Sequence, residues 1–307
     1  MKTTSTRFTA LDVFRGLTVC FMIIVISPGS GAVPYRQLDH AAWHGFTVTD
    51  LVFPSFLFAV GNALSFSENK FRHLSSNTVL FSIFKRAVII FILGYLLSWF
   101  PFFRLTADNA IVSYPISETR IFGVLQRIAI CYLLTALAVR YIDRKLLIYL
   151  AIAVLLVYWL ILVAFGSADP FSLEGNAILK LDLLLFGQAH LYYDRGTFDP
   201  EGLLSTMPAV VNTLAGYLAG KYLQEKGTSP IILRPLIAIG LAGIAIALVW
   251  NTVFPINKKI WSSSFALLTI SIDLILLALL VFITKNQKDK EKNWIRFFTI
   301  FGKNPLF

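Results

Sequence analysis

Residues 40–58 combine ionisable side chains with an apolar run, and this combination is the strongest indication of the fold. They read His-Ala-Ala-Trp-His-Gly-Phe-Thr-Val-Thr-Asp-Leu-Val-Phe-Pro-Ser-Phe-Leu-Phe. A buried amphipathic helix distributes its polar residues along one face, at intervals of three or four. Here both histidines and Asp50 precede the apolar residues instead. The pattern is typical of a membrane helix that begins just after a polar site.

The composition of the whole chain agrees with a membrane protein. Of its 307 residues, 57% are hydrophobic and only 14% are charged, whereas a soluble domain has about 25% charged residues. The mean hydropathy is +0.72. Apolar segments recur from end to end with short polar breaks. We therefore predict an all-α polytopic integral membrane helix bundle that forms a single transmembrane domain over residues 1–307.

Eight apolar segments are each long enough to cross a bilayer, which takes about 20 helical residues. A ninth begins at Trp294 and is cut short at Phe307, so we expect it to be partial. Pro54 lies inside the second segment and is expected to kink it near the polar site. The eight segments are residues 11–28, 46–66, 86–103, 121–139, 146–165, 203–220, 231–254 and 262–284.

The loop charges predict an orientation. Lysine and arginine are far more frequent in the loops on the N-terminal side of the bundle than on the other side, and such an excess is typical of the cytoplasmic side. We therefore expect the N-terminus in the cytoplasm and His40 outside. The acidic residues show the reverse distribution, which suits either a cationic amino sugar at the outer surface or ordinary solvated loops.

The net charge of +10 does not indicate a nucleic-acid-binding protein. Its basic residues alternate with membrane segments, whereas nucleic acid requires one water-facing patch. Cys20 and Cys131 lie in apolar segments, where cysteine behaves as a small hydrophobic residue. The cysteines therefore indicate neither a disulfide framework nor a zinc site.

The longest outer segment, residues 166–208, is expected to be an extracytoplasmic loop. Its apolar stretch at 177–186 is too short to span a bilayer and is expected to form an interfacial or re-entrant helix. His190 and Tyr192 follow in a run of aromatic and charged residues. They are candidate sugar-binding residues, with the alternative that His190 only marks the membrane interface.

Arg15 and Arg127 lie inside predicted membrane segments, where ionisable residues are costly and usually functional. Asp12 precedes Arg15 by three residues, so an internal ion pair on one helix face is an equally good explanation. Arg15 would lie near the cytoplasmic surface, and Arg127 nearer the outer one. Both are candidate cations for binding an anionic cofactor.

His40 and His44 are the residues best placed for chemistry. On a helix they would share one face and bind a metal with His190 or Asp50 as a third ligand, but Gly45 argues against a helix there. The alternative without a chemical role is that His40 and His44 only mark the membrane interface. The sequence contains neither a Gly-x-Ser-x-Gly elbow nor a phosphate-binding loop. The residues alone therefore predict a histidine-centred site but no particular reaction.

Six stretches of the chain resemble the heparan-alpha-glucosaminide N-acetyltransferase family of transmembrane acyltransferases. One is residues 40–58, and another is Leu-Asp-Val-Phe-Arg-Gly-Leu at 11–17. Together the six cover nearly the whole chain. The other four are Gly-Val-Leu-Gln-Arg-Ile-Ala at 123–129, Phe-Asp-Pro-Glu-Gly-Leu-Leu at 198–204, Pro-Ile-Asn-Lys-Lys at 255–259 and Phe-Gly-Lys-Asn-Pro-Leu at 301–306.

The resemblance implies a reaction. Proteins similar to this one transfer acetyl from acetyl-CoA on the cytoplasmic side to the amine of a terminal glucosamine on the opposite side. A bacterial member would act on amino sugars or cell-wall fragments across the inner membrane. The family's catalytic histidine falls on His40, and Trp43 and His44 of the same motif become candidate substrate-binding residues. Asn304, in the last stretch, becomes a candidate cofactor contact.

Two mechanisms stay open for His40. An amine attacks a thioester only when deprotonated, and imidazole, with an ordinary pKa of about 6.5, is suited to take that proton. The rival mechanism makes His40 a covalent acetyl carrier. In both, Asp50 is expected to fix the imidazole tautomer, as carboxylates do for other catalytic histidines. No metal is expected.

Two departures from the family pattern matter. Family members usually carry Asn in a Val-Asn-x-Pro-Gly turn where this chain has Ile26. Loss of an oxyanion donor costs about 10²- to 10³-fold, so a catalytically weakened relative is one alternative, unless Ser27 substitutes. Family members also continue beyond Phe307, so the domain is expected to be incomplete at its C-terminus.

The competing functional class is an amino-sugar transporter or flippase, because broken helices and buried charges also form substrate paths. A transporter would accumulate labelled sugar unmodified, whereas an acetyltransferase would release it acetylated. The expected partners are acetyl-CoA, an amino sugar and the lipid bilayer. The sequence leaves open whether the protein forms a homodimer.

Overall fold

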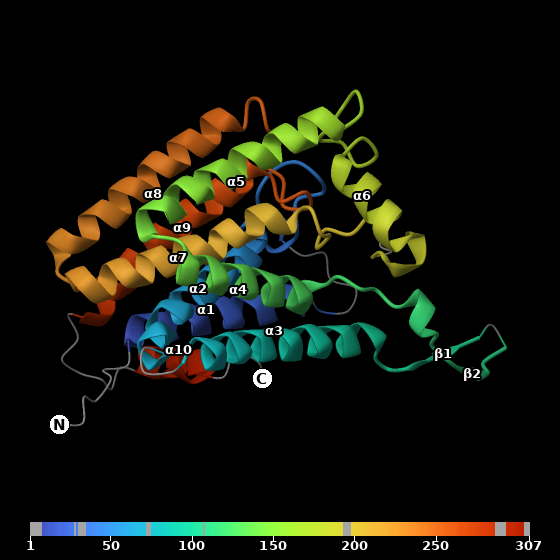
Figure 1. Cartoon of the computed structure of the whole chain (residues 1–307), viewed down its shortest axis with the longest axis horizontal. Coiled ribbons are helices and arrows are strands. Elements are labelled where there is room, and N and C mark those ends of the chain that lie inside the picture. Colours follow the sequence, from blue (N-terminus) through green and yellow to red (C-terminus); the bar gives the residue numbers. More distant parts are fainter. Residues whose placement is uncertain are drawn as a thin grey trace.

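The computed structural model describes residues 8–27, 29, 35–71, 75–106, 108–192, 198–285 and 293–303. Within them helices are the predominant secondary structure, with a single pair of three-residue strands among the described residues (Figure 1), which confirms the predicted all-α class. The long helices are α1 (Thr9–Ile26), α2 (Val52–Phe71), α3 (Ser76–Trp99), α4 (Val124–Tyr141), α5 (Arg144–Phe165), α7 (Thr206–Lys226), α8 (Pro230–Trp250) and α9 (Ser263–Lys285).

The shorter elements lie mostly in the connections. They are helices α6 (Ala177–Phe186) and α10 (Asn293–Lys303), the 3₁₀ turns η1 (Arg36–Leu38), η2 (Val48–Leu51), η3 (Ile116–Glu118) and η4 (Gln188–His190), and strands β1 (Phe103–Leu105) and β2 (Ile111–Ser113). The two strands pair antiparallel, with Arg104 opposite Val112. Helix α6 coincides with the apolar stretch too short to span, and Asn176 caps it by accepting a hydrogen bond from the Leu179 N–H at 2.9 Å.

Seven of the described helical segments are long and apolar enough to cross a membrane, namely those of α1 to α5, α8 and α9. The segment predicted at 203–220 forms α7, which has the length but is not among the seven. Its buried residues include Asn212 and Thr213 as well as apolar side chains. Such polar residues can lie within the bundle because α7 packs against α2, α4, α5 and α9.

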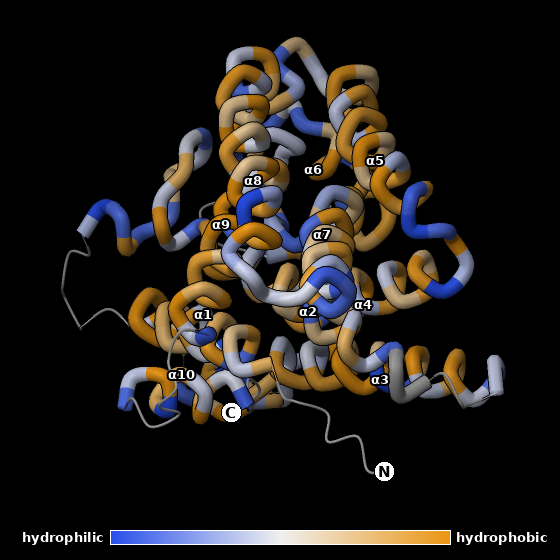
Figure 2. The backbone as a smooth tube through the Cα atoms, turned by 90° about the vertical axis from the view of Figure 1, so that its left-hand side faces the viewer, coloured by the Kyte–Doolittle hydropathy of each residue, from blue (hydrophilic) through white to orange (hydrophobic). Residues whose placement is uncertain are grey.

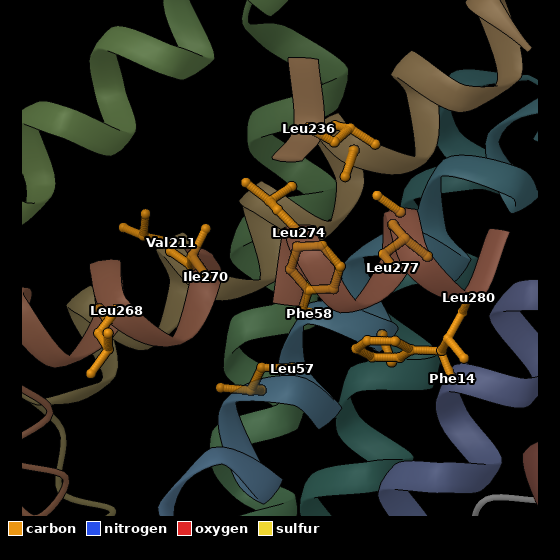
Figure 3. Close-up of a cluster of buried hydrophobic side chains, with 14 of the residues drawn as sticks. Phe14, Leu57, Phe58, Val211, Leu236, Leu268, Ile270, Leu274, Leu277 and Leu280 are labelled. Atoms are coloured by element: carbon orange, nitrogen blue, oxygen red, sulfur yellow. The ribbon is translucent and has the colours of Figure 1, made fainter. Parts of the chain in front are cut away.

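Helices α2 and α9 form the centre of the bundle. Of their membrane segments 61% is buried, against 22% for α3 and α5. Figure 3 shows the core between them, where Phe14 of α1, Phe58 of α2 and Leu277 of α9 lie close together. In Figure 2 the helices are coloured mostly as hydrophobic, whereas hydrophilic residues gather at helix ends and loops. Many large hydrophobic side chains of the outer helices are exposed, among them Phe81 of α3, Leu160 of α5 and Leu241 of α8. A bundle embedded in lipid requires this distribution.

Helices α2 and α7 approach each other closely because glycine lies at their contact. A Cβ atom at Gly61 would lie 1.7 Å from the Thr213 carbonyl oxygen, and one at Gly216 would lie 1.9 Å from that of Phe58. Only glycine fits at such distances, and small residues at helix contacts are typical of membrane bundles.

Two helix boundaries differ from the prediction. Helix α3 begins at Ser76 rather than near residue 86, because Ser75 caps it by accepting a hydrogen bond from the Thr78 N–H. Helix α2 begins only at Val52, so Pro54 lies in its first turn. The 3₁₀ turn η2 leads directly into this first turn, where proline is well tolerated.

The long helices run back and forth, so their connections gather at two ends (Figure 1). We call one of them the histidine end. It consists of residues 35–51, 100–106, 108–123, 166–192, 198–205 and 251–262. The described N-terminal residues of α1, the start of α5 and the end of α9 lie at the opposite end.

Candidate functional site

His40 and Asp50 form the central pair of the histidine end. The His40 Nδ1 lies 2.7 Å from Asp50 Oδ1. The Asp50 side chain is 1% exposed, whereas that of His40 is 46% exposed. Because a carboxylate only accepts hydrogen bonds, we assign the ring proton to Nδ1, which leaves the lone pair on Nε2. The pair thus combines a buried acceptor with a ring that substrates can reach.

The loop that leads into α2 holds Asp50 in place. Its Oδ2 accepts hydrogen bonds from the backbone N–H of Thr47 at 3.0 Å and of Ala41 at 3.3 Å. Gly45 turns the chain between them with a φ of +115°, a conformation that favours glycine. Residues 41–47 are therefore not helical, so His40 and His44 do not share a helix face, as the metal alternative would require.

Lys258, which sequence reasoning did not select, completes this site. Its Nζ lies 3.1 Å from His40 Nε2 and 3.3 Å from Nδ1. Burial lowers the pKa of the Lys258 ammonium, an effect that Glu201 and Asp50 oppose. The signal available in the sequence was the Pro-Ile-Asn-Lys-Lys stretch, but nothing in the spacing shows that it reaches residue 40.

The Lys258 loop and the His40 loop are joined directly. The Gly45 N–H donates to the Ile256 carbonyl at 2.8 Å, and Asn257 Nδ2 lies 3.4 Å from His44 Nδ1. Figure 1 shows the loop before α2 beside the loop between α8 and α9. Two segments about 200 residues apart in sequence therefore build one site, which explains why local patterns reveal only half of it.

Trp43 and His44 lie at the same site. The Trp43 Nε1 donates to the Phe171 carbonyl at 2.8 Å, and its ring meets that of Phe198 edge-on at 5.3 Å. His44 is exposed. Burial of part of its ring lowers the pKa of His44, whereas nearby Asp169 acts to raise it.

His190 and Tyr192 belong to a neighbouring cluster. The His190 Nδ1 lies 2.8 Å from the Thr119 carbonyl oxygen, and the Tyr192 ring lies under the Arg120 guanidinium at 4.5 Å. Asp199 links this cluster to the first, because it accepts the Tyr192 N–H at 3.2 Å and follows Phe198, which contacts Trp43.

Arg120 and its two acidic partners were also missed by sequence reasoning. Arg120 donates to both carboxylate oxygens of Asp199, at 2.8 and 2.6 Å, and to Glu201 at 2.6 Å. Burial alone would lower the pKa of Arg120, but the two carboxylates raise it above its usual range. The network fixes residues 198–202 to the start of α4.

Arg127 lies beneath the site rather than at an open surface. It is fully buried, donates to the Pro200 carbonyl at 2.8 Å and to Ser205 Oγ, and its guanidinium lies 4.9 Å from the Trp261 ring centre. These contacts give Arg127 a role in holding two loops of the histidine end.

Arg15 lines a cavity of about 120 Å³ between α1, α2, α3 and α4. Its NH2 donates to Asp12 at 2.6 Å. The cavity follows α2 from Phe56 to Leu64 and also contains Arg86, whose guanidinium lies 5.0 Å from the Tyr132 ring centre. Its other walls are apolar. Two cations in an apolar cavity suit a ligand with both an anionic and an apolar part.

The remaining sequence predictions concern Asn304, metals and cysteines. Asn304 lies outside the described residues. Among the residues that the structure does describe, no group of three or more His, Cys, Asp or Glu side chains is placed to hold a metal ion. Cys20 and Cys131 are free thiols.

Comparison with known proteins gives a consistent result. A family model described as heparan-alpha-glucosaminide N-acetyltransferase, catalytic, matches residues 7–246. The human heparan-alpha-glucosaminide N-acetyltransferase is 28% identical over an alignment covering 84% of this chain and 46% of the human protein. The mouse protein of the same name is also 28% identical, with 86% of this chain and 47% of the mouse protein covered.

This chain spans about half the length of these curated relatives. The family model nevertheless covers most of the chain, and it includes the His40 loop, Asp50 and the walls of the Arg15 cavity. The chain belongs to the heparan-alpha-glucosaminide N-acetyltransferase catalytic family.

Proposed function

We propose that this protein is a membrane acetyltransferase that moves acetyl from cytoplasmic acetyl-CoA to the amine of an amino sugar at the outer surface. The observation that carries the proposal is the pair formed by His40 and Asp50. A buried carboxylate 2.7 Å from Nδ1 orients a ring that is itself 46% exposed. Within an acetyltransferase family, such a pair suits proton abstraction from an amine.

In this reaction His40 Nε2 accepts a proton from the attacking amine, and Asp50 stabilises the imidazolium that forms. Asp50 is preorganised because its other oxygen is already bound by two backbone N–H groups. The covalent alternative uses the same Nε2 to accept the acetyl group. Both need the tautomer that Asp50 imposes, so both predict that the pair acts as a unit.

We propose that the donor enters between α1, α2, α3 and α4. A second cavity, of about 160 Å³ and lined in part by Glu68 and Arg140, shares Leu64 with the Arg15 cavity. Together the two follow α2 from Phe56 to Glu68, about 18 Å at 1.5 Å per residue. The two cavities lead from the end opposite the histidine end toward the histidine end. Arg15, Arg86 and Arg140 would hold the anionic part of acetyl-CoA.

The acceptor sugar would bind at the histidine end. Trp43, His44, His190 and Tyr192 are our candidate contacts, since aromatic faces and ring nitrogens suit a hydroxylated ring. Tyr192 is 39% exposed and His44 is exposed as well. Asp169 and Glu201 supply negative charge nearby, which favours an ammonium-bearing ligand before it loses its proton.

The proposed membrane placement follows from the charges of the sequence and the two ends of the fold. We propose that residues 1–307 form one transmembrane domain with a cytoplasmic N-terminus in a bacterial inner membrane. Residues 166–208 would then form the extracytoplasmic loop that carries α6. The multi-pass character itself rests on the seven apolar helices.

The test is acetylation of glucosamine by the purified protein in proteoliposomes, with labelled acetyl-CoA supplied on one side only. Acetylated sugar should form on the opposite side. In a parallel assay with labelled glucosamine, sugar that crosses the membrane unmodified would support a transporter instead and contradict the proposal. If transfer is slow, the Ile26→Asn variant restores the side-chain amide that family members usually carry at this position. A rise of about 10²-fold in the rate of transfer would identify Ile26 as the cause of the slow reaction. An unchanged rate would mean that the enzyme does not need this amide.

A further inference from the structure

We propose that Lys258 is a catalytic residue of this acetyl transfer, whose ammonium group binds the carbonyl oxygen of the acetyl thioester as negative charge develops on it. The proposal rests on the function proposed above. Its geometric basis is that Lys258 Nζ lies 3.1 Å from His40 Nε2. That ring nitrogen is the atom to which the attacking amine must deliver its proton.

The distances place the ammonium beside the reaction rather than in its way. Lys258 Nζ is almost equally far from the two ring nitrogens of His40, at 3.1 and 3.3 Å, so it is not aligned with the Nε2 lone pair. An amine that donates to Nε2 must lie about 3 Å from it. The carbonyl oxygen is joined to the carbon that this amine attacks, so it comes within reach of the same ammonium.

The backbone of residues 255–262 holds Lys258 in a fixed position. The Lys258 carbonyl accepts the Trp261 N–H at 3.0 Å, and Asn257 Oδ1 accepts the Ile260 N–H at 3.1 Å. The Asn257 N–H in turn donates to Ser262 Oγ at 3.0 Å. A donor that is already in place costs no reorganisation when charge develops, which is how oxyanion donors act.

The positive charge of Lys258 is not neutralised by an ion pair with any described residue. Among the described residues no carboxylate lies within ion-pair distance of its Nζ, although the side chain is partly buried. A partly buried ammonium without an ion-pair partner is costly. Such groups are found where a substrate supplies the missing negative charge.

The proposed step is balanced in atoms and charge. The amine nitrogen forms a bond to the thioester carbon while its proton passes to His40 Nε2, and the carbonyl oxygen takes up the negative charge beside Lys258. The carbon–sulfur bond then breaks. The CoA thiolate leaves and takes up the proton from the imidazolium, which regenerates His40. The products are the N-acetylated amine and CoA thiol.

The decisive experiment compares Lys258→Met with Lys180→Met in proteoliposomes. Both remove an ammonium at the histidine end, but Lys180 donates to the Phe165 carbonyl at 3.1 Å and is not part of the site. Lys258→Met should lower kcat by about 10²- to 10³-fold, the loss expected for one oxyanion donor. KM for acetyl-CoA, and the stabilisation of the protein by acetyl-CoA in a thermal shift, should stay unchanged. Lys180→Met should behave as wild type.

The pH dependence separates catalysis from a structural role. The wild-type rate should fall on the alkaline side as Lys258 loses its proton, below the ordinary lysine value of about 10.4. Lys258→Arg keeps its charge at such pH, so this variant should retain its rate there. The charged and titratable groups that face Lys258 are Glu201, Asp50, Arg127, Lys259 and His40.

The outcomes distinguish the two proposals. A wild-type protein that acetylates glucosamine together with an equally active Lys258→Met variant overturns the role of Lys258 alone. A Lys258→Arg variant whose rate falls at alkaline pH in the same way as that of the wild type also overturns the role of Lys258. A wild-type protein that binds acetyl-CoA but never acetylates an amine overturns the proposed function, and the role of Lys258 with it.

Discussion

The His40 site and the Arg15 cavity differ in how their polar side chains are held. At the histidine end, Asp50 lies 2.7 Å from His40 Nδ1 and Lys258 lies 3.1 Å from His40 Nε2, and two loops joined by a hydrogen bond hold them there. Between α1, α2, α3 and α4, Arg15 and Arg86 instead face an open volume with apolar walls. Chemistry requires fixed distances between reacting groups, whereas binding a long ligand requires room.

This contrast predicts which kinetic constant each region controls. A change at the His40 site should lower kcat, since these groups act on the atoms that react. A change in the cavity should raise KM for acetyl-CoA, since its cations would bind parts of the donor that do not react.

His40→Ala should lower kcat by about 10²- to 10⁴-fold, because the general base or acetyl acceptor is removed. The measurement is acetylation of glucosamine in proteoliposomes at saturating acetyl-CoA. Arg36→Ala, an exposed change in the same loop, is the control and should keep its rate. An active His40→Ala variant would remove His40 from the catalytic assignment and end the contrast between the two regions.

Asp50→Asn should lower kcat by about 10- to 100-fold, since one charge-assisted hydrogen bond, worth roughly 1.5–3 kcal/mol, is lost. The amide also weakens the preference for the tautomer with the proton on Nδ1. Asp108→Asn changes an exposed carboxylate at the same end and serves as the matched control. If the loss appears in KM rather than kcat, Asp50 binds substrate and does not orient His40.

Arg86→Leu should raise KM for acetyl-CoA by up to about 10- to 100-fold through the loss of a charged hydrogen-bond donor, with little change in kcat. Lys85→Leu removes the neighbouring positive charge, which does not line the cavity. Saturation curves for both variants test the prediction. A normal KM in Arg86→Leu would mean that the donor does not use this cavity.

Gly216→Ala should destabilise the whole protein by about 1–3 kcal/mol, the usual cost of overpacking, because its Cβ would lie 1.9 Å from the Phe58 carbonyl oxygen. Helix α2 connects the two regions, so kcat and KM should both worsen. Thermal unfolding of the detergent-purified protein measures the effect. Leu160→Ala, on an α5 side chain that is 60% exposed, should leave Tm nearly unchanged.

The sequence was enough to recognise the fold class and the first half of the site. The helical membrane segments follow from apolar runs of the required length, which depend on local composition alone. His40 and Asp50 lie only ten residues apart, so one stretch of sequence contains both. The ten-residue apolar segment that forms α6 was visible for the same reason.

Only the tertiary structure brought Lys258 to His40. It also brought Arg120 to residues 198–202, whose Phe198 contacts Trp43, and it placed Arg15 and Arg86 in one cavity. Each of these contacts joins segments far apart in the chain, and their distances depend on how whole helices pack. Helix α7 shows the same limit, because its polar residues are acceptable only where α2, α4, α5 and α9 surround it. Local pattern therefore determined which elements form, and packing decided which side chains meet.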